Sequence, residues 1–226
     1  MITPKMTYQE IAGIFKKEFL EEVQRGYETC FGQIDKLARM ARKLKSDKFH
    51  LYGSHTKMTK QMNEFVVLFF SREKPYKGEP MIRRTVYMRY RLSDGIHIAT
   101  AHPKALDEVT FYTPHFFDRY RERELRKPEI QKNDVINHFM AITAATRIEN
   151  VRNPKYPNSV YATNEEGVLL GENLGNGLFE FRTFISFNML GNDQLLRSSV
   201  QHEESTEMKA FIDSFNRKAI NLSNYL

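Results

Sequence analysis

The strongest constraint on the fold of this chain is an alternating segment, Met81–Arg91, that is followed by the pair Asp94-Gly95. Polar and apolar side chains alternate along this segment, as expected for a strand with one buried face. Asp-Gly is a strong signal for a two-residue hairpin turn, so the residues from Ile96 to Ala101 should return as the neighbouring strand. The continuous apolar run Phe65–Ser71 suits a buried strand. The sequence therefore predicts a three-stranded antiparallel sheet.

One face of the alternating segment is basic and contains an aromatic side chain. It comprises Arg83, Tyr87, Arg89 and Arg91. Aromatic rings stack on bases and arginines pair with phosphates, so this face is a candidate site for single-stranded nucleic acid. An ordinary solvent-facing sheet surface, paired with acidic residues on the neighbouring strands, explains the same pattern equally well.

Periodicity and turn signals extend the prediction to the rest of the chain. We expect helices at 7–46 (with Thr7 as N-cap), 113–127, 132–145 and 205–219, strands at 159–163, 168–173 and 178–187, and a connector at 102–112. The predicted fold class is α+β, with an N-terminal helical segment, an antiparallel β-sheet, two helices packed on a three-stranded antiparallel meander, and a C-terminal helix. Two regions are expected, residues 1–105 and residues 106–226, and a single domain fits the length equally well.

Charge and composition narrow the functional classes. The formal net charge is +6, and basic residues concentrate in the segments 36–60 and 72–91. This excess favours a polyanion partner, nucleic acid before a membrane surface, and a merely soluble lysine-rich surface is the alternative. We expect a cytoplasmic protein that is not bound to a membrane, because no apolar run could span a bilayer and the N-terminus lacks a signal-peptide pattern. The single Cys30 and the spacing of the histidines argue against a metal site, and no cofactor is expected.

The segment 113–123 contains the main candidate for chemistry. Thr113 and Pro114 are typical of a helix start, and His115, Arg119 and Arg123 follow at four-residue intervals. This spacing places the three side chains on one stripe of an α-helix. The pattern favours a neutral His115, the form that a general base requires, beside two guanidinium groups suited to hold a phosphate.

Neighbouring residues allow other interpretations of this helix. Asp118, Glu122 and Glu124 lie three or four residues from its arginines, so the helix could equally form a salt-bridged solvent face. Thr183 lies in the middle of the apolar face expected for the last strand of the meander, where a hydroxyl group needs a partner. That partner is either the histidine and first arginine of the helix, if the helix packs over this sheet, or a nearby backbone carbonyl.

From about residue 112 to residue 188, the order of these features resembles that of a small bacterial domain family. Its members have a His-x3-Arg-x3-Arg helix, a second helix, and a meander with a Thr in the last strand. The family is grouped by similarity with the BrnT-like toxins and the wider barnase–colicin–RelE-like ribonuclease fold. The resemblance implies a ribonuclease-like fold with site residues His115, Arg119, Arg123 and Thr183.

These observations lead to one preferred hypothesis and two alternatives. The preferred one is a metal-independent ribonuclease in which His115 deprotonates a ribose 2′-hydroxyl, Arg119 and Arg123 hold the phosphate, and the basic sheet face binds flanking RNA. Thr183 would orient the phosphate or the histidine. No general acid for the leaving oxygen is obvious, and the candidates are Tyr120, Tyr161 and Lys127. The alternatives are a non-catalytic nucleic-acid-binding accessory protein and a structural or interaction protein with a salt-bridged arginine helix. The expected partner is RNA or another polyanion, together with an antitoxin-like protein if the chain is a toxin.

Overall fold

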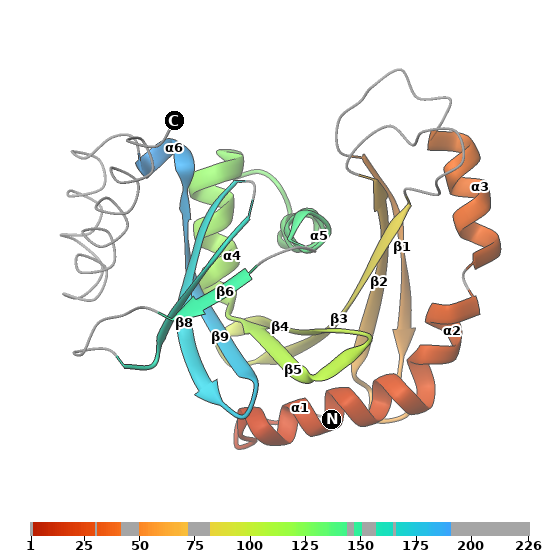
Figure 1. Ribbon diagram of the computed structural model, residues 1–226, viewed down its shortest axis with the longest axis horizontal. Coiled ribbons are helices and arrows are strands. Elements are labelled where there is room, and N and C mark those ends of the chain that lie inside the picture. The colour runs from red at the N-terminus through yellow and green to blue at the C-terminus, as the bar shows by residue number, and fades with distance from the viewer. Residues whose placement is uncertain are drawn as a thin grey trace.

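The computed structural model describes residues 2–29, 31–41, 50–71, 82–143, 147–150, 157–164 and 166–190. These residues form one nine-stranded sheet in the order β1-β2-β3-β4-β5-β9-β8-β7-β6 (Figure 1). The strands are β1 (His50–Met58), β2 (Glu64–Ser71), β3 (Arg83–Leu92), β4 (Gly95–His102), β5 (Ala105–Tyr112), β6 (Arg147–Asn150), β7 (Ser159–Thr163), β8 (Gly167–Gly175) and β9 (Leu178–Ser186). All neighbouring strands pair antiparallel except β5 and β9, which are parallel.

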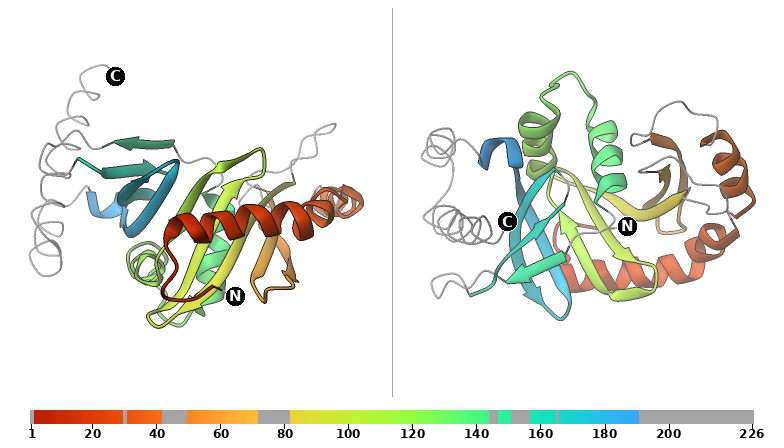
Figure 2. Two further views of the ribbon diagram at one scale, coloured as in Figure 1. Left: turned by 90° about the horizontal axis from the view of Figure 1, so that it is seen from below. Right: turned by 45° about the horizontal axis from the view of Figure 1, so that its top comes forward.

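Helices cover both faces of this sheet. They are α1 (Tyr8–Glu18), the π-helical turn η1 (Phe19–Val23), α2 (Gln24–Thr29), α3 (Phe31–Ala41), α4 (Pro114–Tyr120), the π-helical turn η2 (Arg121–Leu125), α5 (Lys132–Ile142) and α6 (Phe187–Leu190). The sheet is strongly curved, and α5 lies in the hollow between its two upright ends (Figure 1). On the opposite face, α1 crosses the strands (Figure 2). The fold therefore has a curved sheet between two sets of helices.

The apolar run of β2 shows why both faces are covered. Phe65, Val67 and Phe69 belong to the core shared with α1 and α3, whereas the side chains between them belong to the core shared with α4 and α5. A continuous apolar run is typical of a strand that is buried on both sides. The alternation of β3 is distributed in the same way, since Val86 packs on the α1 side and Tyr87 on the α5 side.

The predicted fold class is wrong in its architecture. We expected two separate antiparallel sheets, and the described residues instead form a single mixed sheet of nine strands. The junction is the parallel pairing of β5 with β9, from Val109↔Leu178 to Tyr112↔Phe181. Residues 102–112, expected to be a connector, contain β5. Its first half is mostly exposed and its second half mostly buried, so its sequence lacks the alternation that marks a strand.

Local features of the chain match the sequence more closely. The strand predicted at 159–163 is confirmed as β7, and the helix predicted at 132–145 is confirmed as α5 with an earlier end. Thr7 caps α1 in a capping box, in which its hydroxyl accepts from the Glu10 N–H and the Glu10 carboxylate accepts from the Thr7 N–H. The helix expected at 205–219 lies outside the described residues.

The expected boundary between residues 1–105 and residues 106–226 falls at the start of β5. This strand pairs with β4 on one side and with β9 on the other, so the sheet continues across the boundary. The division into two regions stays a prediction.

Candidate functional site

The helix start at residue 113 has the geometry that its sequence predicts. The Thr113 hydroxyl accepts a hydrogen bond from the Phe116 N–H at 3.3 Å, and Pro114 occupies the first helical position. His115 is exposed, and the Arg119 Nε–H donates to its Nε2 at 3.2 Å. Arg119 therefore already uses Nε2 of His115 as its acceptor. For Nε2 to accept a proton from a ligand, Arg119 would first have to move.

Arg123 does not continue the stripe of His115 and Arg119. The helix changes to the π-helical turn η2 at Arg121, and a π turn contains roughly one residue more than an α turn. Arg123 instead points to the edge of β9, where its Nη1 donates to the Phe184 carbonyl at 2.7 Å and to the Thr183 hydroxyl at 3.3 Å. The structure thus brings the four predicted residues together as two pairs, His115 with Arg119 and Arg123 with Thr183.

The reason for the second pair lies in the sheet. The pairing of β5 with β9 ends at Tyr112↔Phe181, and no other strand of the described residues pairs with the rest of β9 on that edge. Both acceptors are on buried residues, since Thr183 and Phe184 are almost inaccessible to solvent. The guanidinium of Arg123 satisfies backbone and hydroxyl oxygens that would otherwise lack a protein partner there. This contact gives Arg123 a structural role.

The basic face of β3 is divided by α5. Tyr87 is buried beneath α5, its hydroxyl donates to the Asn137 side chain at 2.6 Å, and burial raises its pKa well above the usual range. Arg89 pairs with the Glu64 carboxylate through its Nε at 2.7 Å. Arg83 and Arg91 are exposed at opposite ends of the strand. β3 therefore lacks the continuous basic surface that we expected, because α5 packs on the middle of the strand.

A buried polar network that the sequence analysis did not find connects α4, α5 and the segment before β8. The Tyr120 hydroxyl donates to the Glu166 carboxylate at 2.5 Å and lies 2.8 Å from His138 Nδ1. Burial, followed by the charge of Glu166, raises the pKa of Tyr120 far above its usual range. Burial also lowers the pKa of His138. The Tyr120 hydroxyl is therefore engaged within this network.

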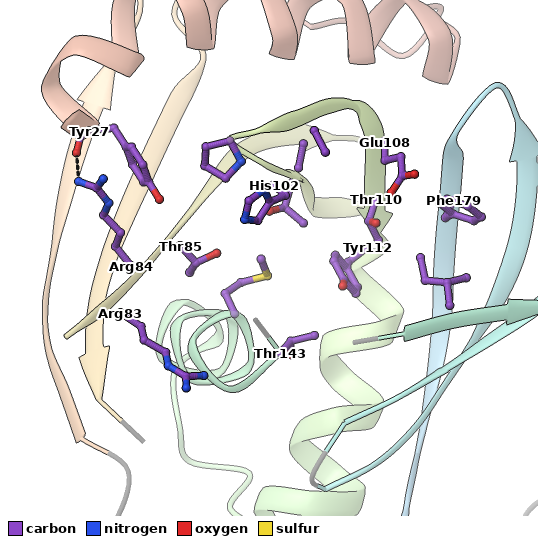
Figure 3. Close-up of a pocket in the computed structure, with 16 residues that line it drawn as sticks. Tyr27, Arg83, Arg84, Thr85, His102, Glu108, Thr110, Tyr112, Thr143 and Phe179 are labelled. Atoms are coloured by element: carbon purple, nitrogen blue, oxygen red, sulfur yellow. Dashed lines mark hydrogen bonds between the residues drawn. The ribbon is translucent and has the colours of Figure 1, made fainter. Parts of the chain in front are cut away.

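A cleft opens at the end of β3 that contains Arg83. The strand pairs with β2 from Arg83 onward but with β4 only from Tyr87 onward, so its first residues run past the end of β4. The cleft has a volume of about 520 Å³ and reaches the β4–β5 turn, β9 and the end of α5. We call it the arginine cleft; its basic and aromatic lining comprises Tyr27, Arg83, Arg84, His102, Tyr112 and Phe179 (Figure 3).

The arginine cleft contains a stacked pair at one end. The Arg84 guanidinium lies 3.9 Å from the centre of the Tyr27 ring and also donates to the Tyr27 carbonyl (Figure 3). Sequence reasoning missed Arg84 because it occupies a position of β3 whose neighbours Ile82 and Val86 are apolar and buried. A charged residue in an otherwise apolar series was the available signal. Tyr27 and His102 come from distant segments, and no local pattern connects them with β3.

The lining of the arginine cleft combines charge with hydrogen-bonding groups. The Arg83 side chain makes no hydrogen bond or ion pair within the part of the chain that the structure describes. Among the described residues, the lining contains one acidic side chain, Glu108, against the two guanidinium groups of Arg83 and Arg84. Such a volume is in the range of ligand sites, and the balance of charge suits an anion.

The described residues include no group of three or more His, Cys, Asp or Glu side chains placed to hold a metal ion. Among them, no helix combines the length and apolar character that a membrane span requires. The chain matches no family model, and searches of curated proteins and of solved structures found no match. The resemblance to the ribonuclease toxins therefore stays a prediction.

Proposed function

We propose that this protein binds single-stranded RNA in the arginine cleft without cleaving it. The observation that carries the proposal is that Arg83 and the stacked pair Arg84–Tyr27 line the same cleft of about 520 Å³. Arginines pair with phosphates, and an aromatic ring stacked with a guanidinium offers a flat platform for an unstacked base. Single-stranded RNA presents both groups together.

The position of the cleft supports one-strand binding. Its walls are β3, the β4–β5 turn and the end of α5, and Tyr112 and Phe179 lie at the end opposite Tyr27 (Figure 3). The hydroxyl groups of Thr85 and Thr110 also line it, and hydroxyls are suited to contact phosphate or ribose oxygens. Base edges and sugars of a splayed strand would find polar partners there.

Binding to fluorescein-labelled oligouridylate, followed by anisotropy at several salt concentrations, tests the proposal. Arg83→Ala should weaken binding and lower the magnitude of the log–log salt slope by about 0.7, the value for one phosphate contact in a single strand. The matched control is Arg91→Ala, which removes the same charge from the other end of β3, outside the cleft. The control should leave the slope unchanged. Equal losses in the two variants, or no binding by the wild type, would refute a site in the cleft.

Cleavage by His115 is a second candidate function, favoured by the exposed His115–Arg119 pair. Neither residue lines the arginine cleft. Incubating the oligonucleotide with the protein in EDTA distinguishes the two functions. Binding with intact RNA supports the proposal, whereas chelator-resistant cleavage that disappears in His115→Ala supports the ribonuclease.

A further inference from the structure

A second cavity lies at the opposite end of β3 from the arginine cleft. The pairing of β2 with β3 begins at Glu64↔Arg89, so Tyr90 and Arg91 run past the end of β2. The space beside them has a volume of about 380 Å³ and is closed by the β1–β2 turn. We call it the methionine cavity; the residues that matter for its character are Ile2, Met58, Met62, Tyr90, Arg91 and Ile96.

Two exposed methionines form the rim of this cavity. Met58 is 47% exposed and Met62 is 62% exposed, and both belong to the few large apolar side chains that are exposed among the described residues. Methionine side chains are flexible and polarizable, and they are over-used at surfaces that accept varied apolar partners. Their exposure beside a cavity indicates a docking surface rather than scattered surface residues.

The backbone at Met62 is strained, with φ at 62° in the left-handed region. This conformation costs an ordinary side chain about 1–2 kcal/mol, and Gly or Asn adopts it more easily. The β1–β2 turn needs such a residue, since the Met62 N–H donates to the Thr59 carbonyl at 3.0 Å. Strain that a smaller residue would relieve is often retained at functional positions.

The turn that carries Met62 is held rigidly by the N-terminal helices. Asn63 is buried, and its side-chain N–H groups donate to the buried Glu18 carboxylate at 3.0 and 3.1 Å. The Lys60 N–H donates to the Glu22 carboxylate at 3.1 Å. The backbone of the turn is thus preorganised, which reduces the entropy lost on binding, while the methionine side chains stay adaptable.

The charge of the cavity determines which partner fits. Arg89 is neutralised by the Glu64 carboxylate. Arg91 is exposed and makes no ion pair within the described part of the chain. One positive charge therefore remains beside an apolar rim. A matching ligand presents an apolar side chain next to a carboxylate.

We propose that the methionine cavity docks an acidic peptide segment of a partner protein. An apolar side chain of the segment enters the cavity between Met58 and Met62, and a neighbouring carboxylate pairs with Arg91. The surface is separate from the arginine cleft, so the proposal is independent of RNA binding. A protein with both sites would hold an RNA strand and an acidic protein segment at opposite ends of β3.

The test uses the full chain with 13C-labelled methionine methyl groups, so that each of the ten methionines reports on its own surroundings. Two short peptides are added, one rich in Glu, Asp, Leu and Phe, and one with every acid replaced by Lys. The acidic peptide should shift the Met58 and Met62 signals and leave that of Met40, which is 52% exposed on α3, unchanged. The lysine peptide should shift none of them.

Arg91→Glu should lower the affinity for the acidic peptide by about tenfold and allow the lysine peptide to bind. Met62→Asn keeps the left-handed backbone accessible and should also weaken the acidic peptide. Arg83→Glu is the matched control and should change neither titration. The proposal is overturned if the two peptides shift the Met58 and Met62 signals equally. It is also overturned if these signals shift when the protein concentration is raised without peptide, or when oligouridylate is added. Those last two results would assign the cavity to a second copy of the chain or to RNA.

Discussion

Removing the Arg123 side chain tests whether this residue stabilises the fold, in contrast to Arg119 on the preceding turn of the same helix. Arg123→Ala leaves the Phe184 carbonyl and the Thr183 hydroxyl without their donor at the edge of β9. Hydrogen bonds from a charged group contribute about 1.5–3 kcal/mol, and the 2.7 Å contact with the carbonyl is the stronger of the two. We therefore expect Arg123→Ala to lower the free energy of unfolding by about 2 kcal/mol.

Arg119→Ala is the matched comparison on the preceding turn. The Arg119 side chain is only 15% exposed, but its contacts reach solvent: it pairs at 3.0 Å with Glu122, whose side chain is 56% exposed, and donates to the exposed His115. Surface pairs contribute about 0–1 kcal/mol, so the expected loss is roughly 0.5 kcal/mol. Thr183→Val removes only the 3.3 Å contact of Arg123 and should also cost less than Arg123→Ala.

Thermal unfolding followed by far-UV circular dichroism is the suitable assay, because the chain contains no Trp to report by fluorescence. A loss of about 2 kcal/mol lowers Tm by about 4–8 °C in a chain of this size, against about 1–2 °C for a loss of 0.5 kcal/mol. The reasoning is refuted if Arg119→Ala and Arg123→Ala lower Tm equally. It is also refuted if Arg123→Ala keeps its Tm and abolishes RNA binding, because Arg123 would then act on the ligand.

Two further predictions concern backbone space and protonation. In Gly171→Ala the new Cβ would overlap the Glu180 carbonyl oxygen, so the free energy of unfolding measured with denaturant should fall by more than about 2 kcal/mol. Gly13→Ala in α1 has no neighbour within 4 Å and should raise the free energy of unfolding by roughly 0.5–1 kcal/mol. Equal effects of the two substitutions would contradict this reasoning. Because burial lowers the pKa of His138, stability present above about pH 6.5 should fall as the pH drops through the lower pKa of the folded state. His138→Asn should have a flatter dependence of Tm on pH between about 7.5 and 5, and an unchanged profile would count against the burial argument.

The elements that the sequence predicted well depend on residues close together in the chain. The capping box of Thr7 spans three positions. The predicted hairpin between β3 and β4 is confirmed, but its two-residue loop is Ser93-Asp94, one residue earlier than expected, because Leu92 pairs with Gly95. The helix start at Thr113 is equally local. Caps, turns and periodicity act through neighbours, so their physical causes can be read without knowing the fold.

The candidate site followed from the sequence only in part. Arg83 was expected at a binding surface and lines the arginine cleft, and His115 and Arg119 were expected to lie together and do. The residues that line the cleft together with Arg83 include some from α2 and from the β4–β5 turn, and no spacing rule connects these segments with β3. The π-helical turn that redirects Arg123 has no clear sequence signal, because four-residue spacing predicts a common stripe only in an α-helix.

The sequence by itself determined where most helices and strands begin, which residues alternate along β3, and that the chain carries a basic excess. Only the tertiary structure decided that β5 pairs with β9 and that α5 covers Tyr87. It also decided that Tyr27 lines the same cleft as Arg83 and Arg84. The parallel pairing joins Val109 to Leu178, and such long-range pairs form because both faces of the sheet must be buried at once. Burial on both faces can be read from the apolar run of β2, but the partner of β5 cannot be read from the sequence of β5, because that partner lies far away along the chain.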